Sequence, residues 1–215
     1  CVNNGCIPTK TMVASARAAY VARNAAKYGV NTGPVSVDYS VVKRRKDEIV
    51  AGSVKGLVDW LAATKGVTTI WGDAKFTGPH EVEVNGERLA APQIFINAGG
   101  RPVIPDWPGL SDVPYLTNVS MMELSELPSH LVIVGGSYIG LEFAQMFRRF
   151  GSRVTVLEVG PRLVSREDPD VSDSIADILR NEGVTLHFNM DASKLSVAPM
   201  HNGTIGVAAM IGGRL

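Results

Sequence analysis

Apolar and polar residues recur along this chain with two different periods, and the period changes where predicted helices give way to predicted strands. Residues 10–28 form an alanine-rich stretch of high helix propensity that ends at Gly29. In residues 38–64 apolar residues recur every three or four positions, which predicts a second helix with one buried face. The apolar positions of that face are Val42, Ile49, Val50, Val54, Leu57, Val58 and Leu61.

From residue 67 onward the period shortens to two, which predicts extended strands. The strands expected from this pattern are residues 67–72, 73–76, 81–84 and 87–89. Asn85-Gly86 separates the last two, and Asn-Gly between alternating residues is a strong hairpin signal. A short apolar strand at 94–96 enters a turn at 97–102. The proline-rich residues 102–128 lack periodicity, so we interpret them as a linker with short turns that contains a domain boundary.

A buried strand, a glycine turn and a helix follow the linker. Residues 131–134 are all apolar, as expected of a strand that is buried on both faces. A helix at 141–150 and a second strand at 153–157 come next, and residues 203–215 also have strand-forming character. This order of elements predicts an α/β fold whose later part contains a parallel sheet.

The glycine turn has the spacing of a dinucleotide-binding site. Its residues are Gly135, Gly136, Ser137, Tyr138, Ile139 and Gly140. Gly135 permits the tight turn, Gly140 permits close packing of the helix, and free N–H groups at the helix start can bind a pyrophosphate. Ser137 replaces the usual middle glycine, so the ligand must approach past a small side chain. The alternative is a glycine-rich turn that binds no ligand.

A carboxylate follows the second strand of this unit. Glu158 lies about 20 residues into the unit, where a carboxylate accepts hydrogen bonds from the ribose 2′- and 3′-hydroxyls and repels a 2′-phosphate. We therefore expect NAD to be favoured over NADP. Arg153 and Arg162 flank Glu158 and would weaken this preference.

Both cysteines of the chain lie in its first six residues, which points to redox chemistry. In a regular helix Cys1 and Cys6 would be about 7.5 Å apart along the axis, farther than a disulfide spans, so the backbone between them must be irregular. Gly5 permits such a backbone, and Pro8 favours a helix start. The helix dipole and Lys10 would then favour a thiolate. The alternatives are a structural staple and two unrelated cysteines.

The segment CVNNGCIPTK resembles the redox-active signature of the class I pyridine nucleotide-disulfide oxidoreductases. This flavoenzyme family includes dihydrolipoyl dehydrogenase, glutathione reductase and mercuric reductase. The matching positions are Cys1, Val2, Asn3, Gly5, Cys6, Pro8 and Lys10. The resemblance implies that Cys1 exchanges with the substrate and that Cys6 lies against the flavin.

The same resemblance implies roles for residues outside the cysteine window. Tyr138 would gate the nicotinamide pocket, and Glu142 would pair with Lys10. The alternative for the last two is that each is an ordinary helix-terminal charge satisfied by water. The residues implied in FAD binding are Thr9, Lys10, Ala98 and Gly99, with Ala98 standing where the family usually has threonine.

The resemblance also implies a domain organisation. Residues 1–122 would be the remainder of an FAD-binding domain, with helices and a β-meander, and residues 123–215 an incomplete Rossmann-type NAD(P)-binding domain. We expect a glycine loop before Cys1 and a dimerisation domain after the chain, so the parent protein would be a homodimer. The acid-base histidine of the family belongs to that dimerisation domain.

Composition narrows the class of partners. The 21 basic and 21 acidic residues cancel, so nothing in the charge favours a nucleic acid, and no apolar run is long enough to span a membrane. These properties favour a soluble cytoplasmic protein. The four histidines lack metal-ligand spacing, so we expect no metal site. The run of cations at 43–46 is interpreted as a solvated helix face, with a phosphate contact as the alternative.

These patterns together predict an FAD-dependent NAD(P)H:disulfide oxidoreductase. Electrons would pass from NADH through the flavin to the disulfide of Cys1 and Cys6, and then to a small-molecule disulfide, a dithiol or Hg(II). Thr9 is more similar to the dihydrolipoyl and mercuric branches than to the glutathione branch, but the sequence does not separate those two. The alternative function is a thiol redox sensor that binds a dinucleotide without catalysis.

Overall fold

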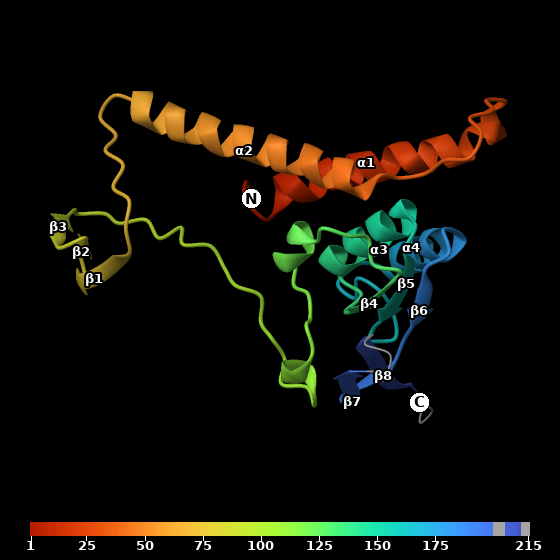
Figure 1. Ribbon diagram of the computed structural model, residues 1–215. Helices are drawn as coiled ribbons and strands as arrows, with labels where there is room; N and C mark the ends of the chain where they lie inside the picture. Colours follow the sequence, from red (N-terminus) through yellow and green to blue (C-terminus); the bar gives the residue numbers. More distant parts are fainter. Residues whose placement is uncertain (200–204, 212–215) are drawn as a thin grey trace. The chain divides into compact units, whose positions relative to one another are not determined.

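A computed structural model describes residues 1–199 and 205–211 (Figure 1). The chain divides into two compact units. One contains Cys1–Val50 and Ile104–Leu215, and the other contains Ala51–Val103. Each unit is described by itself below, and the domain boundary near residue 122 stays a prediction.

The first helix, α1, covers Cys6–Asn24 and continues as the short 3-10 helix η1, Ala25–Tyr28. The helix expected at 10–28 is therefore confirmed, with a start four residues earlier. Gly29 ends it in the left-handed conformation, at φ 77°, which favours glycine. The inner face of α1 buries Met12, Ala16 and Ala19, and α1 packs against a later helix of the same unit, α3.

The second helix, α2, covers Tyr39–Ala63, as the apolar period predicted. Asp38 caps it: its carboxylate accepts N–H bonds from Ser40 at 3.0 Å and Val41 at 3.2 Å. The hydroxyl of Ser40, together with these amides, lowers the pKa of Asp38.

The predicted buried face of α2 is correct only at its start. Val42 is buried, whereas Ile49, Leu57 and Val58 are each more than a third exposed. Val50, Val54 and Leu61 are only partly buried. The period identified the apolar stripe, but burial also needs a packing partner, and the buried residues of α2 are confined to its first two turns.

The cationic run at 43–46 is not a uniformly solvated face, and that expectation was wrong for Lys46. Lys46 is only 3% exposed. Its ammonium donates to the backbone oxygen of Met122 at 2.8 Å and forms ion pairs with Asp47 and Glu123. Lys43 also bonds Asp47, at 2.8 Å. The run thus fastens α2 to the 3-10 helix η3, Ser120–Glu123.

A three-stranded antiparallel meander forms the sheet of the unit Ala51–Val103. Its strands are β1 (Ala74–Gly78), β2 (Glu81–Val84) and β3 (Glu87–Ala90), in that order. Asn85 and Gly86 both have positive φ, 54° and 83°, so the Asn-Gly hairpin is confirmed.

The strands expected at 67–72 and 94–96 are absent, because both segments have irregular backbone. A strand is stabilised by the ladder of a neighbour, and the described sheets pair neither segment with another strand. The strand expected at 73–76 corresponds to β1, which begins one residue later and ends two residues later than expected.

A parallel sheet with two crossover helices forms the later part of the other unit. Its order is β4 (His130–Val134), β5 (Arg153–Leu157) and β6 (Thr185–His187). The connections are α3 (Tyr138–Phe150) and α4 (Pro169–Asn181), which lie beside these strands in Figure 1. Phe147 of α3 and Val156 of β5 are fully buried in the core. The strand, glycine turn, helix and strand expected here are confirmed, with α3 beginning three residues earlier.

The remaining elements are short or lie near the end of the chain. The proline-rich linker contains η2 (Leu110–Asp112) and η3 and is otherwise irregular, as expected. Strands β7 (Met190–Pro199) and β8 (Ile205–Ile211) form an antiparallel pair. Residues 203–204 and 212–215 of the predicted final strand lie outside the described residues. Within the described chain, no helix is both long and apolar enough to cross a membrane.

Candidate active site

The two cysteines form a disulfide at the start of α1. Their Cα atoms are 4.8 Å apart, within the usual span of a disulfide, and both residues are exposed. The chain turns through residues 2–5 before Cys6 begins the helix, so the expected irregular backbone is confirmed. A Cβ on Gly5 would lie 3.1 Å from the Cα of Cys1, closer than ordinary packing. Glycine at this position therefore lets the loop close.

Thr9 stabilises the first turn of α1. Its hydroxyl donates to the backbone oxygen of Gly5 at 2.7 Å, and its N–H donates to the same oxygen at 3.2 Å. The hydroxyl oxygen keeps lone pairs for a further donor. The predicted FAD contact of Thr9 stays a prediction.

Lys10 and Glu142 meet in an ion pair that joins α1 to α3. The expected pairing is therefore present, although the two residues are 132 positions apart. Their side chains are 63% and 35% exposed, so solvent screens the attraction and its contribution to stability is small. The pair shows which parts of the two helices are neighbours, because it brings the start of α1 beside the start of α3.

The two helices run in the same direction. Lys10 meets Glu142 near their starts, and Arg23 donates to the backbone oxygen of Arg149 near their ends. Their N-terminal ends therefore lie at the same end of the pair. Cys6 and Tyr138 each precede the ion pair by four residues, or about 6 Å along their own helix. Tyr138 is 69% exposed at this end.

The glycine turn between β4 and α3 has the geometry that close packing requires. Gly135 adopts φ 109° and donates to the backbone oxygen of Leu157 at 2.8 Å. A Cβ on Gly140 would collide with the backbone oxygen of Gly135 and lie 3.2 Å from the Cγ2 of Ile133. Only glycine lets α3 approach the strand this closely. Ser137, at the N-cap, is exposed with extended backbone.

The Glu158 carboxylate is held against this turn by backbone amides. One oxygen accepts the N–H of Gly136 at 2.5 Å, and the other accepts the N–H of Gly160 at 2.7 Å. A Cβ on Gly136 would lie 2.6 Å from the Cδ2 of Leu163 and 2.9 Å from the carboxylate. The space at Gly136 is therefore already used by the groups that position Glu158.

Gly160 is a site residue that the sequence analysis missed. The available signal was a second glycine two positions after the carboxylate that follows β5, where a free N–H can face back toward it.

Ile139 is exposed at the start of α3 beside Tyr138. These residues lie at the carboxyl ends of β4 and β5, the edge of a parallel sheet where dinucleotides bind.

Ala98 and Gly99 belong to the other unit, in the irregular segment that precedes the linker. Gly99 has φ 74°, which favours glycine, and a Cβ there would meet open space. Their contribution to a flavin site stays a prediction.

In the described part of the chain, no three His, Cys, Asp or Glu side chains are grouped as metal ligands.

Comparison with known proteins identifies relatives over nearly the whole chain. A family model described as "Pyridine nucleotide-disulphide oxidoreductase" matches residues 1–205. A mercuric reductase of Streptomyces lividans is 42% identical over 193 residues, which are 87% of this chain and 40% of that protein. A dihydrolipoyl dehydrogenase of Bacillus subtilis is 34% identical, over 87% of this chain and 42% of that protein.

Solved structures agree with the sequence relatives. The "HOCl-induced flavoprotein disulfide reductase RclA from Escherichia coli" superposes with a TM-score of 0.82 at 35% identity, over 97% of this chain and 44% of that one. This likeness confirms the expected α/β fold class. The chain spans less than half the length of each of these relatives.

Proposed function

Because the chain belongs to the pyridine nucleotide-disulphide oxidoreductase family, we propose that it carries the dithiol and the nicotinamide-binding turn of a flavin-dependent NAD(P)H:disulfide oxidoreductase. The observation that carries this proposal is the ion pair of Lys10 and Glu142 between parallel helices. It supports a site in which the exposed disulfide and the exposed Tyr138 belong to the same end of the α1–α3 pair.

The glycine turn and Glu158 suit a dinucleotide. Gly135 and Gly140 permit close approach of the backbone, and the first turn of α3 offers N–H groups to a pyrophosphate. The Glu158 carboxylate is already oriented by two amides, so it can accept the ribose hydroxyls without rearrangement. Its negative charge repels a 2′-phosphate, so the proposed coenzyme is NADH in preference to NADPH.

The N-terminal end of α1 suits the flavin side of the site. Cys6, Thr9 and Lys10 lie in its first turn and a half, and Cys6 and Lys10 remain accessible there. These residues would contribute to the binding of FAD. Bound FAD and nicotinamide would supply the hydride and electron-pair chemistry that reduces the disulfide.

The chain's own sulfurs perform the second half of the reaction. After reduction, the Cys1 thiolate attacks a substrate disulfide, whose S–S bond breaks and releases one substrate thiol. The Cys6 thiolate then attacks Cys1, which releases the second substrate thiol and restores the Cys1–Cys6 disulfide. The positive end of the α1 dipole favours the thiolate at Cys6. Tyr138 covers the nicotinamide side in this proposal.

The substrate is proposed only as a class. Relatives are named mercuric reductase, dihydrolipoyl dehydrogenase and disulfide reductase, so a small disulfide, a dithiol or Hg(II) fits the same exposed dithiol. We also propose that the active protein is a homodimer located in the cytoplasm.

The test is the protein expressed from its complete open reading frame. It should be yellow, and anaerobic NADH should bleach the flavin and produce a long-wavelength charge-transfer band from the Cys6 thiolate. Cys6→Ser should abolish this band. Cys1→Ser is the matched control, because it removes the other thiol and leaves Cys6 free to give the band. A colourless protein with a titratable dithiol would contradict the proposal and favour the redox sensor.

A further inference from the structure

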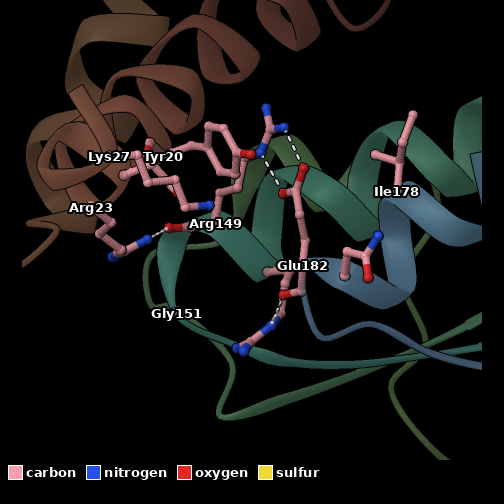
Figure 2. A pocket seen from close by; sticks show the side chains of 10 residues that line it. Tyr20, Arg23, Lys27, Arg149, Gly151, Ile178 and Glu182 are labelled. Carbon is pink, nitrogen blue, oxygen red and sulfur yellow. Dashed lines mark hydrogen bonds and ion pairs between the residues drawn. The ribbon is translucent and has the colours of Figure 1, made fainter.

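A polar pocket lies at the end of the α1–α3 pair opposite the disulfide (Figure 2). It has a volume of about 570 Å³ and is formed by the C-terminal parts of α1, η1, α3 and α4. Its lining residues are Tyr20, Arg23, Asn24, Lys27, Arg148, Arg149, Gly151, Ile178, Asn181 and Glu182. Cys6 and Arg23 are 17 residues apart on α1, or about 25 Å along the helix, so this pocket is remote from the redox end.

One ion pair forms the wall of the pocket. Glu182 accepts two hydrogen bonds from Arg149, at 2.6 and 2.7 Å, and one from Gln145 at 2.8 Å. The guanidinium of Arg149 also lies over the ring of Tyr20, 4.4 Å from its centre. Since Arg149 and Glu182 neutralise one another, they fix the shape of the pocket and contribute no net charge.

The other three cations of the pocket have no carboxylate of the lining as a partner. Arg148 donates to the backbone oxygens of Glu182 and Ser152, at 2.8 and 3.3 Å, and Arg23 donates to the backbone oxygen of Arg149. These bonds leave further guanidinium N–H groups unused. Lys27 makes no hydrogen bond or ion pair with any described residue. Figure 2 labels Arg23, Lys27 and Arg149 among the residues that line the pocket.

We propose that this pocket binds a small phosphate-bearing anion. Arg23, Lys27 and Arg148 line it without a carboxylate partner among the lining residues, and guanidinium groups match the oxygens of a phosphate geometrically. The volume suits a small ligand. A bound phosphate would connect Arg23 and Lys27 to Arg148, and so would fasten the C-terminal end of the dithiol helix to α3.

The experiment is calorimetric titration of the 215-residue chain with inorganic phosphate, pyrophosphate and ADP at constant ionic strength. The test variant is Arg23→Gln with Lys27→Gln. The matched control is Arg17→Gln with Lys65→Gln, which removes one arginine and one lysine from exposed positions outside the pocket. We expect saturable binding that weakens at least tenfold in the test variant and is unchanged in the control.

The three ligands separate the possible sources of the phosphate. Binding of all three indicates a site for free phosphate, whereas binding of ADP alone indicates a nucleotide site. Binding at the glycine turn would be equally strong in both variants, and that result would overturn the proposal, as would no saturable binding to the wild-type chain. Lys27→Gln alone, which breaks no described contact, should give part of the loss. The result does not depend on redox activity, so it is independent of the proposed function.

Discussion

Tyr39, at the start of α2, is buried with an unsatisfied hydroxyl. It is 7% exposed and packs against Phe147 and Phe150, with ring centres 6.0 and 5.8 Å away. Its hydroxyl has no hydrogen-bond partner in the described part of the chain. Burial, with a smaller effect from the charge of Asp47, raises the pKa of Tyr39 to about 12.

Tyr39→Phe should stabilise the protein by about 1 kcal/mol at neutral pH, because it removes a desolvated hydroxyl and keeps the ring contacts. The substitution should also change how the free energy of unfolding depends on pH. Between its unfolded pKa of about 10 and its folded pKa of about 12, Tyr39 ionises only in the unfolded chain, so wild-type stability should fall by up to about 2.7 kcal/mol as pH rises. Urea unfolding on either side of about pH 10 measures both effects.

Tyr28→Phe is the matched control for Tyr39, because Tyr28 is 86% exposed. It should leave both the stability at neutral pH and the alkaline loss unchanged. An equal alkaline loss in wild type and Tyr39→Phe would contradict the assigned ionisation.

Gly136 holds the Glu158 carboxylate through its backbone N–H, and the absence of a side chain leaves room for that carboxylate and for Leu163. Gly136→Ala should raise the Kd for NADH about tenfold, which corresponds to about 1.4 kcal/mol, because the added carbon displaces either Leu163 or the carboxylate. Gly52→Ala is the control, since a Cβ there meets open space on α2. Quenching of NADH fluorescence measures the affinity. Equal affinities in the two variants would show that Glu158 is not held through Gly136.

The contact between α2 and η3 includes the ammonium of Lys46, which donates to the backbone oxygen of Met122 and pairs with Glu123. Burial raises the pKa of Asp47, but hydrogen bonds from Lys43 and Lys46 outweigh it, and the net shift is downward. The hydrogen bond to Asp47 likewise raises the pKa of Lys43. The ion pairs of Asp47 with Lys43 and Lys46 are therefore strongest where Asp47 is ionised, and they weaken as the pH falls through the lowered pKa of Asp47.

Lys46→Met should destabilise the protein by about 1–2 kcal/mol, because the backbone oxygen of Met122 loses its donor while the side chain keeps its length. Asp47 and Glu123 are 44% and 68% exposed, so water can replace the lost ammonium and limits the loss. Chemical denaturation measures the difference. Lys55→Met on the same helix, which removes an exposed pair with Asp59, should change stability by no more than about 0.5 kcal/mol. Similar losses in the two variants would refute a special role for Lys46.

The two units differ in how much of their structure is buried. The core around α3, β4 and β5 contains fully buried residues such as Phe147 and Val156, whereas Val84 is the buried residue among the described strands β1–β3. A small meander with little buried surface opens more readily than a packed parallel sheet. Amide hydrogen exchange should therefore be faster in β1–β3 than in β4 and β5. Equal protection of the two sheets would contradict this expectation.

Local sequence signals were sufficient for most of the elements. Asp38 and Gly29 mark helix ends, Asn85-Gly86 marks the hairpin, and the glycines at 135 and 140 mark the strand-to-helix turn. Each signal acts through the backbone of its own or adjacent residues, by capping, by positive φ or by close packing. The parts of the candidate site within the redox segment and the glycine turn were predictable for the same reason.

Burial and pairing were not predictable in this way, because they depend on residues far apart in the chain. The strands expected at 67–72 and 94–96 have suitable composition but no partner strand in the described sheets. The charge of Lys46 became a buried contact only because Met122, 76 positions later, lies beside it. The role of Gly160 also depends on folding, because its backbone N–H orients the carboxylate of Glu158.

The amino-acid sequence alone therefore indicated the family, the presence of the helices and the hairpin, the cysteine pair and the glycine turn. Folding decided that α1 and α3 run in the same direction, that the disulfide and Tyr138 belong to one end of this pair, and that several cations line the pocket at the other. The physical reason is that backbone conformation responds to near neighbours, whereas side-chain contacts and charge neutralisation are set by whichever distant segments the core brings together.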